Sequence, residues 1–254
     1  MDLAGWERVA YRNEHSMSEK LNGILEAARL HAEEVILPHV DDWNITKTWP
    51  RAASDKAGAA GLMGLYAPEV FGGQGLPLSE GIQVYEQLGL GDGAYAFALS
   101  MHNICTFAAC GYGTEAFKDV WGMELTSGRK LANFALTEPQ SGSDPMKIYT
   151  RATINEDGTW TISGAKAWVS LATEADVYFT FVKTSDVPGH KDMAMITIPA
   201  DASGVSFGPM YHTPSYKFLP MSEMYLDNVV VSEDNIILPI GQGFQGSLMA
   251  IDIA

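Results

Sequence analysis

The sequence predicts an α+β protein, with a helical region up to about residue 130 and a region of strands up to about residue 240. Three observations predict this division. Apolar residues recur at helical spacing through the first half. Near Lys130 the pattern changes to short runs rich in Val, Ile, Thr, Tyr and Phe, separated by turn sequences such as Asp157-Gly158. From Gly241 a helical pattern resumes and continues to the last residue.

Two helices in the first region have recognisable ends. The first is predicted to begin with Ser18 as its N-cap and to stop at Pro38, with one apolar stripe between them. The second is predicted to begin with Ser79 as its N-cap and to end at Gly89. Because the glycine-rich residues 89–93 follow a helix and not a strand, we interpret them as a helix–helix turn and not as a phosphate loop.

A third helix follows, and its composition predicts a central, buried position. Asp92 is its expected N-cap, and nearly all the residues after it are apolar. Cys105 and Cys110 lie on this helix. Because they are five residues apart, their side chains point to different sides of the helix. This disfavours a disulfide between them, so we expect two buried free thiols in a reducing compartment.

Six or seven strands make up the second region, with no helix between them. They are residues 130–138, 147–155, 159–164, 176–184, 193–199, 204–208 and 223–232. This order predicts an antiparallel sandwich or barrel and argues against a fold of alternating strands and helices. We expect an all-helical domain at 1–130, a β domain at 131–240 and the start of a further helical domain at 241–254. Because the last helical pattern stops without a cap, we expect the chain to be a piece of a longer polypeptide.

Composition and charge exclude several classes of function. The chain has 254 residues, of which 46% are hydrophobic and 19% charged, and its net charge is −15. That charge opposes binding to nucleic acid or anionic lipid. The sequence contains no run of about 18 apolar residues, so it predicts no membrane span. The N-terminal residues lack the features of signal and transit peptides, so we expect a cytoplasmic protein. The six histidines lack metal-ligand spacing, and Ser143 has no evident base partner, so we expect neither a metal site nor a serine hydrolase.

Two segments about 25 residues apart carry the candidate site. "FALTEPQSGSD" (134–144) runs from an apolar strand into small polar residues, and "ISGAKAWVS" (162–170) sets a tryptophan among small residues. A flavin ring suits such a setting, because backbone amides and short hydroxyls can reach its polar edge while an aromatic side chain packs nearby. A β-turn beside a core tryptophan explains the same residues and stays open at this point.

Together with "LDNVVVSEDNII" and "GQGFQGSLMAID", these segments resemble the acyl-CoA dehydrogenase family, and they occur in that family's order. "WPRAASDKAGAAGLMGLYAPEVFGGQGLP" resembles the family's N-terminal part. The resemblance implies an N-terminal helical domain, a middle β domain and a C-terminal helical bundle, of which this chain carries the first helix. It also implies FAD as cofactor and oxidation of the α,β bond of an acyl-CoA-type thioester, with hydride transfer to flavin N5.

The resemblance further implies the residues of the site. The flavin would be bound by Phe134, Leu136, Thr137, Gly142, Ser143, Trp168 and Ser170, and the substrate by Ser143 and Asp252. Thr137 would bond the polar edge of the ring, and Ser170 would lie where a threonine hydroxyl usually meets N5. We assign Glu138 and Asp144 to turn and cap roles, because carboxylates are poor contacts for phosphate-bearing ligands.

No residue of this chain can be nominated as the catalytic base. The resemblance implies a glutamate in the C-terminal domain, and the position used by a minority of members falls on Ala254. It also implies an electron-transfer flavoprotein as partner and a homo-oligomer, either a dimer or a tetramer.

Residues 211–221 hardly resemble the family pattern, and Lys217 stands where arginine is common. Two alternatives stay open, and this segment motivates the first of them. The first alternative is a flavin-dependent oxidase or monooxygenase on the same fold. The second is a degenerate, non-catalytic family member whose fold serves assembly.

Overall fold

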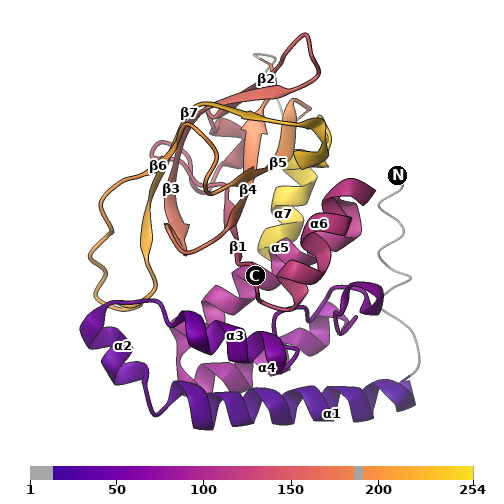
Figure 1. Cartoon of the computed structure of the whole chain (residues 1–254), viewed down its shortest axis with the longest axis vertical. Coiled ribbons are helices and arrows are strands. Elements are labelled where there is room, and N and C mark those ends of the chain that lie inside the picture. Colours follow the sequence, from indigo (N-terminus) through magenta and orange to yellow (C-terminus); the bar gives the residue numbers. More distant parts are fainter. Residues whose placement is uncertain (1–13, 186–190, 254) are drawn as a thin grey trace.

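The structure is a computed structural model that describes residues 14–185 and 191–253. The helices of the first half gather toward one end of the molecule and the strands toward the other, with the last helix beside the strands (Figure 1). This arrangement confirms the α+β architecture, with the helical part first in sequence and the sheet second. None of the helices in the described ranges is long and apolar enough to cross a membrane.

Six α-helices lie between residue 14 and residue 126, in the first part of the described chain. They are α1 (Glu14–His31), α2 (Val40–Thr46), α3 (Arg51–Ala59), α4 (Leu78–Gly91), α5 (Gly93–Tyr112) and α6 (Glu115–Thr126). Short π and 3-10 turns add Ala32–Ile36 and Glu69–Phe71. Residues 37–39 interrupt the first helical run, as the proline at position 38 predicted.

Three predicted helix ends are wrong. Ser18 lies inside α1, which is already helical at Glu14. Ser79 is the second residue of α4, because the carbonyl of Pro77 already accepts the first-turn amides of Glu80 and Gly81, at 3.0 and 3.3 Å. The helix also continues through Gly89 to Gly91. Backbone carbonyls can therefore start a helix where the sequence offers a plausible side-chain cap.

Asp92 is the N-cap of α5, as predicted. Its Oδ1 accepts the backbone N–H groups of Ala94 at 2.7 Å and Tyr95 at 2.9 Å. The helix is central, since it contacts α4, α6 and the sheet, and most of its side chains are buried. Cys105 and Cys110 are both buried and free, as expected.

Replacing Asp92 with alanine should lower the free energy of unfolding by about 1 kcal/mol, because two amides of the first turn lose their acceptor. Ser79→Ala is the matched control, since this exposed serine does not cap its helix. It should change stability by less than about 0.5 kcal/mol. Urea unfolding of both variants measures the difference, and equal losses would show that Asp92 is not a stabilising cap.

In the residues that the structure describes, the second part of the chain forms one mixed eight-stranded sheet. Its strands are β1 (Ala132–Ala135), β2 (Arg151–Ile154), β3 (Trp160–Ser170), β4 (Val177–Lys183), β5 (Met193–Pro199), β6 (Val205–Phe207), β7 (Met221–Val231) and β8 (Ile236–Leu238). Their order is β6-β7-β3-β2-β4-β5-β8, and β1 pairs with β4 beside this path. The last helix, α7 (Gly243–Ile253), packs on β4 and β5.

The prediction of a purely antiparallel sheet needs one correction. Five strand pairs are antiparallel, but β1 runs parallel to β4, and β2 makes a short parallel contact with β4. The chain leaves β1, forms the β2–β3 hairpin and returns to β4 in the original direction, which allows a parallel pair. The three-residue strand β8 was not predicted.

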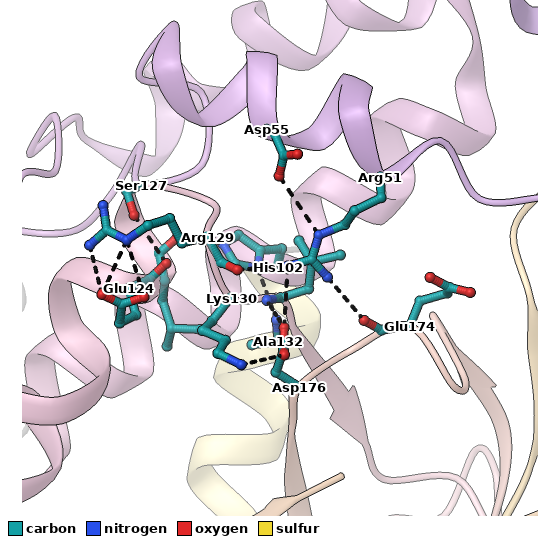
Figure 2. Close-up of polar contacts among 12 residues, drawn as sticks. Arg51, Asp55, His102, Glu124, Ser127, Arg129, Lys130, Ala132, Glu174 and Asp176 are labelled. Atoms are coloured by element: carbon teal, nitrogen blue, oxygen red, sulfur yellow. Dashed lines mark hydrogen bonds and ion pairs between the residues drawn. The ribbon is translucent and has the colours of Figure 1, made fainter. Parts of the chain in front are cut away.

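The segment that enters β1 is tied to both parts of the molecule (Figure 2). Asp176, just before β4, accepts the backbone N–H of Leu131 at 2.8 Å and the ammonium of Lys130 at 2.8 Å. Arg51 of α3 reaches the carbonyl of Arg129 at 2.7 Å and the Asp176 carboxylate at 3.4 Å. The start of β1 is therefore fixed against a helix on one side and a strand on the other.

His102 of α5 supports the same segment from inside the core. Its side chain is fully buried, its Nδ1 accepts the N–H of Ala132 at 3.0 Å, and its Nε2 donates to the carbonyl of Leu125 at 2.9 Å. These two partners require the neutral ring with the proton on Nε2. Burial lowers the pKa of His102 to about 4.

This histidine should make the protein sensitive to acid. The unfolded chain protonates His102 below about pH 6.5, whereas the native ring stays neutral until about pH 4, so stability present above pH 6.5 is lost as the pH falls toward 4. The free energy of unfolding should fall by up to about 1.4 kcal/mol per pH unit from this group. Urea unfolding between pH 7 and 4.5 should show a shallower slope for His102→Gln. The exposed His39→Gln control should keep the wild-type slope, and an unchanged slope in His102→Gln would refute the prediction.

Candidate functional site

The two candidate segments lie side by side in the structure. The N–H of Ala167 donates to the carbonyl of Thr137 at 2.8 Å, and the side-chain amide of Asn133 donates to the carbonyl of Ser170. The residues after β1 therefore run along the second half of β3. Segments about 25 residues apart in the sequence thus form one continuous surface.

A buried ion pair joins the two segments. Lys166 Nζ lies 2.8 Å from Glu138 Oε1 and 3.3 Å from the carbonyl of Leu136, and the two charged side chains are 0% and 2% exposed. Burial lowers the pKa of Lys166 to about 8, against the opposing effect of Glu138. Burial also opposes ionisation of Glu138, but the Lys166 charge and the amide donors outweigh it, so its pKa is lowered.

Glu138 also closes the loop that follows the first segment. Its carboxylate accepts the backbone N–H groups of Tyr149 at 2.5 Å and Thr150 at 3.0 Å, so the loop returns to its starting point. Gly142 and Ser143 are exposed in this loop, and a Cβ added at Gly142 would meet no atom within 4 Å. Asp144 caps the following 3-10 turn (Pro145–Lys147) through the N–H of Met146 at 3.1 Å. Both acids thus have the turn and cap roles that the sequence suggested.

Trp168 is held in an uncommon backbone conformation. Its φ is +58°, and it lies at a register shift between β3 and β7. Its side chain is 59% exposed, and its ring centroid lies 4.4 Å from that of Tyr211. The alternative of a core tryptophan is therefore wrong. Non-glycine residues with positive φ are strained and tend to occur at functional sites.

The other predicted residues are divided between the surface and the core. Phe134 is half-buried, with its ring 4.9 Å from that of Phe181, and Thr137 is half-buried. Ser170 is 6% exposed at the end of β3. The side chain of Leu136 faces the apolar core, so only its backbone can face a ligand. Asp252 lies on α7, which contacts the 3-10 turn after Ser143, but its side chain is outside the described part.

Three residues at this site were not predicted from the sequence: Asn133, Lys166 and Tyr211. Tyr211 borders a polar groove of about 470 Å³ between α2 and the segment that precedes β7. The groove is lined by Asp41, Asn44, Ile45, Lys47, Tyr211, His212, Thr213 and Lys217. Burial and the nearby Glu223 carboxylate raise the pKa of Tyr211, so its hydroxyl stays protonated at neutral pH.

The arrangement suits a flat ligand with a polar edge. It combines an exposed indole ring, two hydroxyl side chains and a loop with open space at Gly142. Within the described residues, no three His, Cys, Asp or Glu side chains are grouped to hold a metal ion. Glu138 and Asp144 both accept backbone hydrogen bonds within the loop that they shape.

Two family profiles match the chain. Residues 18–129 match the profile described as "Acyl-CoA dehydrogenase, N-terminal domain", and residues 133–229 match "Acyl-CoA dehydrogenase, middle domain". Isobutyryl-CoA dehydrogenase, mitochondrial, of Dictyostelium discoideum is 30% identical over 221 residues, which are 87% of this chain and 53% of that protein.

Solved structures with the same fold include butyryl-CoA dehydrogenase from Megasphaera elsdenii, with a TM-score of 0.87 at 26% identity, over 100% of this chain and 64% of that one. A complex of glutaryl-coenzyme A dehydrogenase with glutaryl-CoA has a TM-score of 0.86 at 26% identity, over 99% of this chain and 62% of that one. The chain spans less than two thirds of the length of each of these three proteins.

Proposed function

The chain belongs to the acyl-CoA dehydrogenase family, and from this premise we propose that it forms the FAD site of an enzyme that oxidises the α,β bond of an acyl-CoA-type thioester to the enoyl thioester. Bound FAD supplies the hydride acceptor for this reaction. The observation that carries the proposal is the position of Trp168. It is exposed, has a positive φ, and lies near the hydroxyl residues Thr137, after β1, and Ser170, at the end of β3. Proteins similar to the chain are named as isobutyryl-CoA, glutaryl-CoA and butyryl-CoA dehydrogenases.

The chain's own residues would bind and orient the ligands. Trp168 would pack by the ring, Thr137 would bond its polar edge, and the Ser170 hydroxyl would contact the nitrogen that accepts the hydride. Phe134 and Leu136 support the ring from the strand, and Gly142 leaves room for the cofactor to approach. Ser143 and Asp252 bind the acyl-thioester side of the substrate.

The proton acceptor is proposed to come from a C-terminal domain that completes the enzyme. The α-proton of a thioester needs a carboxylate placed on the α-carbon side. Glu138 is buried in its ion pair and Asp144 is engaged as a cap, so neither fits this role. The chain's contribution is to bind, orient and shield the ligands.

The remaining organisation is proposed from the family. The domains are residues 1–130, 131–240 and 241–254, the last being the start of the C-terminal domain. The enzyme is a homotetramer or dimer that takes part in fatty acid or acyl thioester metabolism. A cytoplasmic location is proposed on a different ground, the N-terminal sequence, which has the features of neither a signal peptide nor a transit peptide. An electron-transfer flavoprotein is its oxidant.

One observation favours a second candidate, a flavin oxidase or monooxygenase. The segment that differs from the family contributes Tyr211, which contacts Trp168 and borders the polar groove. A polar opening beside a flavin edge would suit a substrate other than a thioester.

Anaerobic titration of the FAD-loaded full-length protein with butyryl-, isobutyryl- and glutaryl-CoA tests the proposal. We expect loss of the oxidised flavin absorbance with at least one of these thioesters, slow recovery in air and fast recovery with electron-transfer flavoprotein. Fast recovery in air alone would favour the oxidase. A protein that stays colourless after incubation with FAD would indicate the non-catalytic alternative and refute both enzymes.

A further inference from the structure

The Glu138–Lys166 pair is the most deeply buried ion pair in the described ranges, and stability alone does not explain it. Removing two charges from water costs free energy that their attraction repays only in part. An apolar pair of similar volume is often as stable as a buried ion pair. A role other than stability is therefore worth seeking in what the two side chains hold.

The pair is connected to all three segments of the proposed flavin site. Lys166 donates to the carbonyl of Leu136, one residue before Thr137. Glu138 accepts the amides of Tyr149 and Thr150, which close the loop that carries Gly142 and Ser143. Lys166 also lies two residues before Trp168 on β3.

The backbone around Thr137 is held by hydrogen bonds on both sides of this residue. The carbonyl of Leu136 faces the Lys166 ammonium, and the carbonyl of Thr137 accepts the N–H of Ala167 at 2.8 Å. The backbone of Glu138 exchanges hydrogen bonds with Ser141 at 2.8 and 3.0 Å. With both neighbouring peptides held, little freedom is left to the backbone that carries the Thr137 hydroxyl.

We propose that Lys166 and Glu138 are positioning residues that hold the strand end at Thr137, the loop at Gly142–Ser143 and the bulge at Trp168 in one arrangement competent to bind FAD. Neither side chain touches the ligand in this account. The inference rests on the proposed function, because it concerns how the same site is assembled.

The test is the double variant Glu138→Gln/Lys166→Met in the full-length protein, which removes both charges and keeps the side-chain volumes. The midpoint of thermal unfolding should fall less than in Lys166→Ala, because no buried charge is left unpaired and the glutamine oxygen still accepts one of the two loop amides. The Kd for FAD should rise by about tenfold or more, and the visible circular dichroism of the bound flavin should change. Amide exchange at Tyr149 and Thr150 should also become faster.

Glu33→Gln/Arg29→Met is the matched control, because it removes an exposed ion pair on the first helical run. It should leave the Kd for FAD and the dichroism unchanged. Glu138→Asp keeps the charge and shortens the side chain, and it should weaken FAD binding by an intermediate amount. This single variant decides the matter if the double variant does not fold.

The outcomes separate the inference from the proposed function. If wild-type protein does not bind FAD, the proposed function fails. If wild-type protein binds FAD and the folded double variant, or Glu138→Asp in its place, binds FAD with the same Kd and dichroism, the positioning role is overturned.

Discussion

Lys166→Ala is expected to lower the free energy of unfolding by about 3–5 kcal/mol, because it leaves the Glu138 carboxylate buried without its cation. The two charged groups lie 2.8 Å apart in a fully buried setting. Urea unfolding at pH 7 measures the loss. Lys118→Ala is the control, since it breaks an ion pair with an exposed glutamate on α6 and should cost about 1 kcal/mol or less.

The loss in Lys166→Ala should depend on pH in a defined direction. Without the ammonium that lowers it, the native pKa of Glu138 rises above its ordinary value, because burial is then less opposed. The carboxylate takes up a proton as the pH falls, and the cost of burying its charge disappears. The difference from wild type should therefore shrink between pH 7 and pH 5. A difference that is small at pH 7, or constant with pH, would contradict the account of the pair.

Trp168→Gly should weaken FAD binding by about a hundredfold. Stacking of an aromatic side chain on a planar ring contributes about 1–3 kcal/mol, and the indole would also shield the flavin ring from water. The same change should leave stability equal or slightly higher. The side chain is 59% exposed, so little burial is lost, and glycine adopts φ of +58° without strain.

Fluorescence titration with FAD and thermal unfolding of the full-length protein measure the two effects separately. Trp168→Phe is the conservative control, and its Kd for FAD should lie closer to that of the wild type than to that of Trp168→Gly. Unchanged FAD affinity in Trp168→Gly would remove Trp168 from the site. A large loss of stability would instead show that the indole serves packing.

Local features of the fold could be predicted from the sequence, whereas pairings between distant segments could not. The cap at Asp92 depends on residues within one turn, so sequence alone located it. The start of α4 was misplaced because the carbonyl of Pro77 competes with a serine side chain for the same role. The parallel alignment of β1 with β4 depends on where the chain goes between them, which no local pattern encodes.

The candidate site was likewise predictable only in part. The two segments were found, but their composition did not decide whether Trp168 is buried or exposed. The answer depends on a bulge between β3 and β7, which are far apart in the sequence. The ion pair did leave a signal, since Lys166 stands among apolar and small residues within β3 and Glu138 follows closely on an apolar strand, and a charge buried in such a setting needs an opposite partner. Tyr211 left none, because its segment has no regular pattern.

The flavin content of the full-length protein as purified, and again after incubation with FAD and removal of the excess, tests the central claim most directly. The account predicts one FAD per chain, with a visible absorbance spectrum altered from that of free FAD by its contacts in the site. A folded full-length protein that carries no flavin after both treatments would contradict the assignment of residues 134–170 as a flavin site.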